Sequence, residues 1–199
     1  MLEPSATLAR LDAATRNHHA EVDGYWLDLM AQGVTRELYQ AQLVRLYGFE
    51  APLESALAYT PGFVVADRRD LTRSGLIVQD LIAMGMRPAA AARLPQCDEI
   101  HSFRDPIEAL GWWYVSERGS QLYTSIRRHL VARIPDVANA CAFLSSYDGV
   151  AAARWQQLGV VLDQQAWKHG HEGLVAAASA AFECTRRWFR GGEPVARPA

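Results

Sequence analysis

Residues 11–23 read Leu11-Asp12-Ala13-Ala14-Thr15-Arg16-Asn17-His18-His19-Ala20-Glu21-Val22-Asp23 and have the spacing of an amphipathic helix. A neutral imidazole on such a helix can bind a metal, and in haem proteins it is the axial ligand of the iron. A carboxylate one turn further along can accept the second ring N–H and so fix the ring. His19 is therefore a candidate metal ligand, and Asp23 is its candidate orienting group. The alternative is that His18 and His19 are ordinary helix residues, one at the core edge and one in solvent.

The rest of the chain also has helical periodicity. The 199 residues are 50% hydrophobic, which suits a single domain with a sizeable core. Apolar residues recur at helical spacing nearly everywhere, and we find no hairpin signal. We expect one all-α domain over residues 1–190 and a short disordered tail over 191–199. The expected helices span residues 5–32, 35–58, 67–85, 105–134, 136–145, 147–162 and 170–190, with a short helical turn within 89–93.

Start signals support these helices. Ser5 and Thr35 are expected to cap the first two helices through their side-chain oxygens. The strongest signal combines Asp105 as N-cap, Pro106 at the first helical position and Glu108 closing a capping box.

The helix after Pro106 contains a run of small residues. Ser116, Gly119 and Ser120 are spaced i, i+3 and i+4, so they share one face and form a notch. A glycine within a helix costs about 1 kcal/mol relative to alanine, which asks for a reason. One reason is the close approach of another helix, and another is a kink that lets the backbone lie over a flat ligand. A pocket between this helix and the histidine helix would suit a planar macrocycle.

Charge and cysteine content exclude several classes of function. The net charge of −2 favours neither a nucleic-acid backbone nor an anionic membrane. No apolar run approaches the roughly 20 residues that span a bilayer, and the N-terminus has no signal-peptide pattern. Cys97, Cys141 and Cys184 are widely spaced and form no CxxC motif, which fits a reducing compartment. We expect a cytoplasmic protein that binds neither nucleic acid nor membrane.

Taken in order, several segments resemble the haem oxygenases, especially the short bacterial type found with bacteriophytochromes. Residues 11–23 are similar to the proximal helix of that family, and matching its Ala-Thr-x-x-x-His pattern on Ala14-Thr15 places the axial histidine at His19. Residues 110–122 are similar to the distal helix. Residues 46–54, 143–155 and 176–188 resemble the second conserved helix and the closing helices. The resemblance implies a haem-oxygenase-like helical bundle.

Two departures from the family pattern concern the site. The distal Gly-Gly pair of the family falls near Tyr123-Thr124, and Arg118 stands as an inserted or substituted residue. The kink is then built differently, or a tyrosine intrudes on the haem side. The family also has an arginine just after the aromatic residue matching Trp155, where this chain has Gln156.

The resemblance implies oxidative opening of haem to biliverdin, with release of carbon monoxide and iron. Haem is then both substrate and cofactor, and the electrons come from an external reductant. Neither GxGxxG nor GxxxxGK[ST] occurs in the chain, so a ferredoxin or flavoprotein reductase is the implied donor. A bacteriophytochrome that takes up biliverdin is the implied downstream partner.

The resemblance also implies roles for individual residues. His19 would hold the iron, and Arg16 and Arg154 would pair with the propionates and so set the rotation of the ring. Glu117 would anchor the water chain that delivers protons, although it can also be read as a solvated helix residue. The residues implied in catalysis lie on the distal helix: Ser116, Glu117, Gly119 and Ser120.

Three other functions stay open. A divergent member that binds haem or a related tetrapyrrole as a carrier or sensor, without turnover, is favoured by the missing distal glycines. A di-iron site on the same fold would draw on Glu50, Glu54 and Asp80, but the chain has no Glu-x-x-His motif. A purely structural or interaction protein is the third, in which His169-Gly170-His171 is a solvated loop or a metal site.

Overall fold

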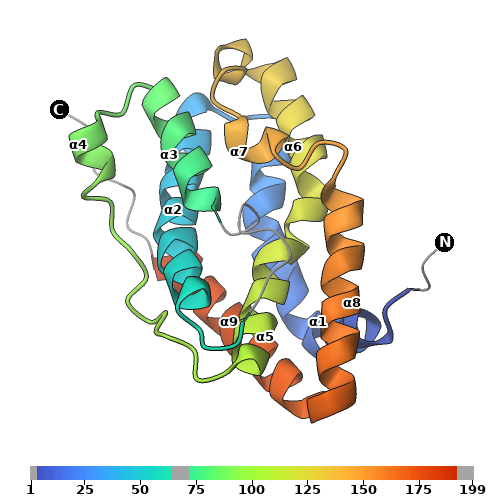
Figure 1. Cartoon of the computed structure of the whole chain (residues 1–199). Helices are drawn as coiled ribbons and strands as arrows, with labels where there is room; N and C mark the ends of the chain where they lie inside the picture. Colours follow the sequence, from blue (N-terminus) through green and yellow to red (C-terminus); the bar gives the residue numbers. More distant parts are fainter. Residues whose placement is uncertain (1–3, 64–71, 192–199) are drawn as a thin grey trace.

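The structure is a computed structural model that describes residues 4–63 and 72–191, and this part of the chain forms helices and no strand (Figure 1). The predicted all-α, single-domain fold is therefore confirmed. The α-helices are α1 (Ala6–Leu27), α2 (Arg36–Ala58), α3 (Arg73–Ala83), α4 (Pro88–Ala91), α5 (Pro106–Arg118), α6 (Ser120–Arg133), α7 (Ala142–Ser145), α8 (Ala151–His169) and α9 (Glu172–Gly191). The short 3₁₀ helices are η1 (Asp28–Met30) and η3 (Pro135–Val137).

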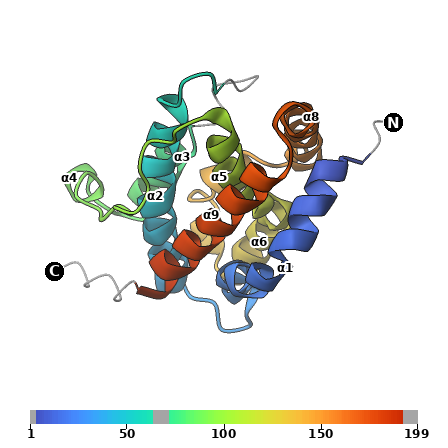
Figure 2. The ribbon, with the colours of Figure 1, turned by 90° about the horizontal axis from the view of Figure 1, so that it is seen from below.

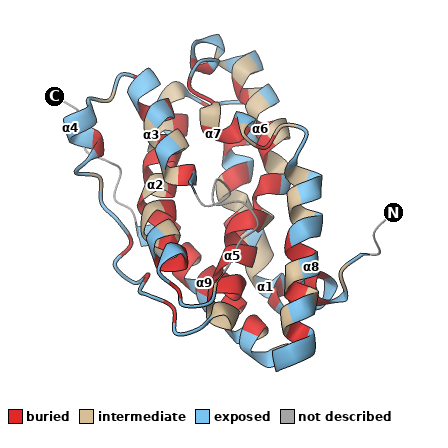
Figure 3. Ribbon diagram, viewed as in Figure 1, coloured by how far each residue is buried: buried red, intermediate tan, exposed pale blue. Residues whose placement is uncertain are grey.

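The helices pack around α5 and α6. Helices α1 and α8 lie on one side of this pair, and α2 and α3 lie on the other (Figures 1 and 2). Helix α9 crosses beneath the bundle and packs on α5, α1 and α2. The buried residues line the faces that these helices turn toward one another, so that one core runs through the molecule (Figure 3).

The first two helices begin where the caps were predicted. The Ser5 hydroxyl accepts the Leu8 N–H at 3.1 Å, and the Thr35 hydroxyl accepts the Leu38 N–H at 3.2 Å. Each bond satisfies one of the backbone donors that the first turn of a helix leaves unpaired.

Helix α5 also begins at its predicted cap, but its capping box differs. Asp105 accepts the N–H groups of Ile107 and Glu108 at 2.9 and 3.0 Å. The Glu108 carboxylate accepts the N–H of Arg104 at 2.9 Å, one residue before the cap. The predicted reciprocal bond from Glu108 to the cap residue itself is therefore wrong by one position.

Other helix boundaries differ from the prediction. The first helix stops being α-helical at Leu27 and continues as η1 to Met30, short of residue 32. The helix predicted over 147–162 corresponds to α8, which begins only at Ala151. Gly149 has a positive φ of 73°, which is not a helical conformation, so the helix starts after it. Part of the helix predicted over 67–85 and the tail after Gly191 lie outside the described residues. Within the described ranges, every helix is too short or too polar to cross a lipid bilayer.

The helix predicted over residues 105–134 is divided at Gly119. Helix α5 ends at Arg118 and α6 begins at Ser120. The division lies at the notch of small residues and next to α1, so it bears directly on the site.

Candidate functional site

The His19 side chain lies on α1 and is only 12% exposed. The Thr15 hydroxyl donates to the Leu11 carbonyl at 2.7 Å, so its oxygen is left to accept the His19 Nε2–H at 3.0 Å. This network assigns the ring proton to Nε2 and the lone pair to Nδ1. The nearest carboxylate on that side is Asp12, whose Oδ1 is 3.7 Å from Nδ1.

Both histidines pack against Phe182 of α9. The Phe182 ring centroid lies 5.4 Å from the His19 ring and 5.7 Å from the His18 ring. Burial, and then the positive charge of Arg118, lower the pKa of His19 below its usual value. His19 is therefore held neutral, which is the form that can bind a metal.

Asp23 does not take the orienting position predicted for it. Arg118 at the end of α5 binds both carboxylate oxygens of Asp23, with Nη2 at 3.0 Å from Oδ2 and Nη1 bonded to Oδ1. A bidentate guanidinium is a stronger partner for a carboxylate than a neutral imidazole. The Arg118–Asp23 pair therefore ties α1 to α5, and the carboxylate facing His19 is Asp12.

Gly119 lies where α1 packs closely on α5 and α6, which we call the distal helices. A Cβ atom at Gly119 would lie 3.0 Å from the indole nitrogen of Trp26 and 3.0 Å from the hydroxyl of Tyr123. The Trp26 and Tyr123 rings are 4.7 Å apart. The first explanation offered for this glycine, the close approach of another helix, is therefore confirmed. The helix is also interrupted there, but a kink that serves a flat ligand stays a prediction.

Two cavities adjoin α1. The cavity between α1 and the distal helices has a volume of about 30 Å³ and is lined by Asp23, Trp26, Glu50, Ser116 and Tyr123 among others. That volume holds about one water molecule. A cleft between α1 and α8, lined in part by Asp12 and Trp155, has a volume of about 420 Å³. The cleft is in the size range of small-molecule sites, whereas the first cavity is far below it.

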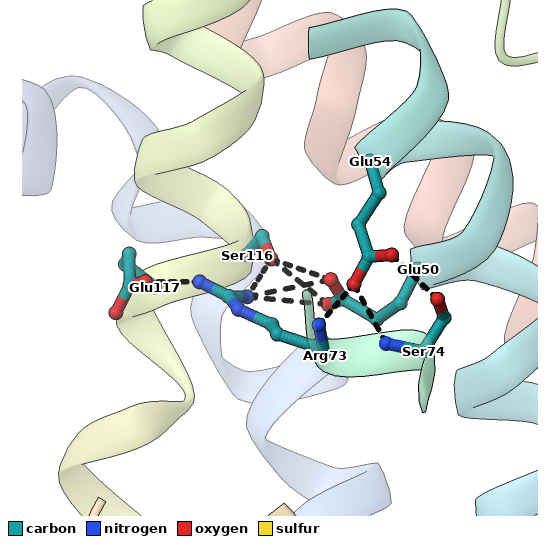
Figure 4. Close-up of polar contacts among 6 residues, drawn as sticks. All are labelled: Glu50, Glu54, Arg73, Ser74, Ser116 and Glu117. Carbon is teal, nitrogen blue, oxygen red and sulfur yellow. Dashed lines mark hydrogen bonds and ion pairs between the residues drawn. The ribbon is translucent and has the colours of Figure 1, made fainter. Parts of the chain in front are cut away.

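A buried ion cluster joins α2, α3 and α5 (Figure 4). Arg73, the first residue of α3, pairs with Glu50 of α2 and with Ser116 and Glu117 of α5. The Ser116 hydroxyl is 2.8 Å from Glu50 Oε1, and Arg73 Nη1 is 3.4 Å from Glu50 Oε2. The three charged side chains are at most 5% exposed. We call Glu50, Arg73, Ser116 and Glu117 the Arg73 cluster.

The Arg73 cluster has two carboxylates for one guanidinium. Burial raises the pKa of Glu50, although Arg73 and Ser116 act in the opposite direction. Glu117 pairs with Arg73 through Oε1, while its buried Oε2 has no hydrogen-bond partner among the described residues. The interpretation of Glu117 as a solvated residue is therefore wrong. Glu50 is the member of the cluster whose proton affinity the surroundings increase.

Glu54 fixes the backbone from which Arg73 extends. Its carboxylate accepts the N–H of Ser74 at 2.6 Å as well as the N–H of Arg73 (Figure 4). These are the unpaired donors at the start of α3, so Glu54 acts as a cap supplied by another helix. The Arg73 guanidinium is thus positioned from both ends.

The other predicted site residues lie in different surroundings. Ser120 is buried, and its hydroxyl has no hydrogen-bond partner among the described residues. The Arg154 guanidinium lies over the Tyr147 ring at 4.8 Å, and the Arg73 guanidinium lies 5.8 Å from that ring. Arg16 is exposed on α1. Arg154 and Arg73 therefore share Tyr147 as a neighbour.

Arg73 is the main site residue that the sequence prediction missed. Its signal is present, because Arg73, Ile77, Asp80 and Leu81 follow helical spacing and are all buried. Of the carboxylates considered for a di-iron site, Glu50 and Glu54 flank Arg73. Asp80 instead caps α7 by accepting the N–H groups of residues 142 and 143.

Of three comparisons with known proteins, one identifies the family of this chain. The family model described as heme oxygenase matches residues 5–191, which is nearly the whole chain. No curated protein and no solved structure matches the chain significantly. A match of this extent shows that the chain belongs to the haem oxygenase family.

Proposed function

We propose that this chain is a haem oxygenase in which His19 is the axial ligand of the iron. The observation that supports it most directly is the state of His19, which is partly buried, neutral and facing one carboxylate across 3.7 Å. Family membership makes haem the substrate in general. The assignment of His19 as the ligand is our proposal.

The donor set fits an iron porphyrin in its chemistry. A neutral imidazole is a common axial donor. With Nε2 toward the iron, the ring proton would lie on Nδ1, where Asp12 at 3.7 Å is the carboxylate that would orient the ring. When bound, the iron porphyrin supplies the oxygen-activating chemistry and is itself the molecule that is cleaved. His19 Nε2 is bonded to Thr15 in this conformation, so this bond must be released if Nε2 is to be the coordinating atom.

The space beside the distal helix fits a ligand only after a movement. The cavity between α1 and the distal helices has room for about one water molecule. Its walls include the Arg118–Asp23 pair and Trp26 packed against Gly119. We propose that haem enters as α1 separates from α5, which breaks this ion pair. The small side chains Gly119, Ser116 and Ser120 would then form the distal wall.

The Arg73 cluster would supply and hold the proton that oxygen chemistry consumes. Glu50 and Ser116 both line the small cavity, so a water molecule there would lie beside the carboxyl group whose pKa is raised by burial. Arg73 balances the charge of Glu117 and also donates to the Ser116 hydroxyl, which in turn donates to Glu50. We therefore assign Glu50 as the proton-holding group, with Glu117 and Arg73 as positioning residues.

The remaining parts of the proposal follow the family. The products would be biliverdin, carbon monoxide and iron, and a ferredoxin or flavoprotein reductase would provide the electrons. Arg16 and Arg154 would contact the propionates, and a bacteriophytochrome in the same cytoplasm would receive biliverdin, as in the bacterial type that the sequence resembles.

A second candidate is a protein that binds haem or another tetrapyrrole without cleaving it. The observation that favours it concerns Tyr123, which lies near the sequence position where the family has its distal Gly-Gly pair. The Tyr123 hydroxyl packs against Gly119. A tyrosine there fills volume that a bound gas molecule and its waters would need.

Aerobic reduction of the hemin complex separates the two functions. The protein is reconstituted with hemin, and a ferredoxin, its reductase and NADPH are added under air. The oxygenase predicts loss of the Soret band with a rise of biliverdin absorption, and Glu50→Gln is expected to slow this conversion at least tenfold. A Soret band that persists through several equivalents of reductant contradicts turnover and supports the binding protein.

A further inference from the structure

Cys97 and Cys184 are close neighbours although 87 residues separate them in sequence. Their sulfur atoms are 3.6 Å apart, and both side chains are buried. Cys97 lies in the irregular segment between α4 and α5, whereas Cys184 lies on α9. The cysteine pair therefore brings together two parts of the fold that are distant in sequence.

Two further contacts fix the position of the segment that contains Cys97, one to α2 and one to α9. The Cys97 N–H donates to the Gly48 carbonyl of α2 at 2.8 Å, which fixes the segment against the bundle. Arg187 pairs with Glu99 through Nε at 3.0 Å and Nη2 at 2.6 Å. Arg187 is three residues beyond Cys184, and Glu99 is two residues beyond Cys97. The thiols are therefore kept together by bonds on both sides of them.

The two sulfur atoms differ in acidity. Either sulfur can donate in this contact, and a hydrogen bond from Cys184 lowers the pKa of Cys97 to about 7. The same bond, together with burial, raises the pKa of Cys184. Cys141 differs from both, since burial raises its pKa and its thiol donates to the Val137 carbonyl at 3.2 Å. Thiolates are the reactive form, and a thiolate at Cys97 would have a resolving thiol 3.6 Å away.

We propose that Cys97 and Cys184 form a reversible disulfide when the protein meets a hydroperoxide. The Cys97 thiolate attacks one peroxide oxygen, the O–O bond breaks, and a sulfenic acid and hydroxide form. The sulfur of Cys184 then attacks the sulfenic sulfur, its proton leaves with the displaced hydroxide as water, and the S–S bond closes. One hydrogen peroxide is reduced to two waters, and two thiols are oxidised.

The geometry requires only a small adjustment for this bond. A disulfide has an S–S distance of about 2.05 Å, so the sulfurs must approach by roughly 1.5 Å. The neighbours Gln96 and Asp98 are exposed, so a local opening of this segment brings Cys97 to solvent. The bond would fasten the segment to α9, the helix whose Phe182 contacts His19. This inference does not depend on the proposed function.

Peptide mapping after mild oxidation tests the proposal. The reduced protein is treated with a few equivalents of hydrogen peroxide, the remaining thiols are blocked, and the protein is digested without reductant. We expect one cross-linked peptide joining Cys97 to Cys184, a mass lower by two hydrogen atoms, one free thiol at Cys141 and full reversal by dithiothreitol. The midpoint of thermal unfolding should rise by roughly 5–15 °C in the oxidised form.

Two variants serve as controls. Cys141→Ser should form the same cross-link, whereas Cys184→Ser should stop at the sulfenic acid of Cys97, which a dimedone probe detects. Wild-type protein that keeps three free thiols, or that oxidises first at Cys141, overturns the proposal. The mapping on wild-type protein stands even if Cys184→Ser does not fold.

Discussion

At the scale of single residues, burial has the same effect on two groups of opposite charge type. It lowers the pKa of His19 and raises the pKa of Glu50, because in each case it disfavours the charged form. The imidazole thereby keeps its lone pair and the carboxyl holds its proton more tightly. A metal ligand and a proton donor need these two states.

Glu50 gives a stability prediction with a definite sign. Folded Glu50 keeps its proton to a higher pH than it does in the unfolded chain, so its contribution to stability is present at low pH. That contribution is lost as the pH rises through the raised pKa. Relative to wild type, Glu50→Gln should therefore gain free energy of unfolding as pH rises, by at most about 1.4 kcal/mol per pH unit. Urea unfolding between pH 4 and pH 8 measures this difference.

Glu99 is the matched control for this measurement. Its hydrogen bond to Arg187 lowers the pKa of Glu99, so its contribution is present at neutral pH and is lost as the pH falls. Glu99→Gln should therefore show the opposite trend, weakened by solvent because the pair is exposed. A Glu50→Gln protein that loses stability relative to wild type as pH rises contradicts the account.

The residue scale is also where prediction from the sequence was weakest. The Ala-Thr-x-x-x-His pattern selects His19, but a pattern cannot show which partners a side chain takes. Asp23 has the right spacing for His19, yet it binds Arg118 because α5 brings a guanidinium against it. Arg73 was missed because its role depends on Glu50 and Glu117, which come from two other helices.

At the scale of elements, the relation of α1 to the distal helices decides access to the site. The Arg118–Asp23 pair and the packing of Trp26 on Gly119 hold the helices together. Separating the helices costs free energy when a ligand enters between them, and weakening the Arg118–Asp23 pair should lower this cost.

Asp23→Asn should therefore speed haem binding. The substitution keeps the shape of the side chain but removes the charge that pairs with Arg118. A partly exposed ion pair is worth about 1 kcal/mol, so the association rate should rise about fivefold. Stopped-flow recording of the Soret band measures this rate.

Glu21→Gln is the control on the same helix, because Glu21 pairs with Arg186 and Arg190 of α9 and not with α5. It should leave the association rate unchanged. An unchanged association rate in Asp23→Asn, or an equal increase in both variants, would show that the Arg118–Asp23 pair does not control haem entry.

Elements were easier to predict than residues, for a physical reason. Caps are local, so Ser5, Thr35 and Asp105 mark the starts of α1, α2 and α5 from the sequence alone. Helix ends and interruptions depend on packing partners from distant segments. Gly119, where the predicted continuous helix is divided, lies against Trp26 of α1, a contact that the local sequence does not reveal.

At the scale of the whole molecule, the bundle brings α1, the distal helices and α9 together around one position. Phe182 of α9 packs on His19, while Arg118 of α5 lowers its pKa. The family match over residues 5–191 covers all of these segments.

Titration with hemin tests the role of His19 most directly. Wild-type protein and His18→Ala should each form a saturable one-to-one complex with the ferric spectrum of a histidine-ligated haem. His19→Ala should lose that spectrum while its far-UV circular dichroism stays unchanged, since the partly buried ring contributes little to the helix itself. A wild-type spectrum in His19→Ala, or its loss in His18→Ala instead, would contradict the assignment of the axial ligand.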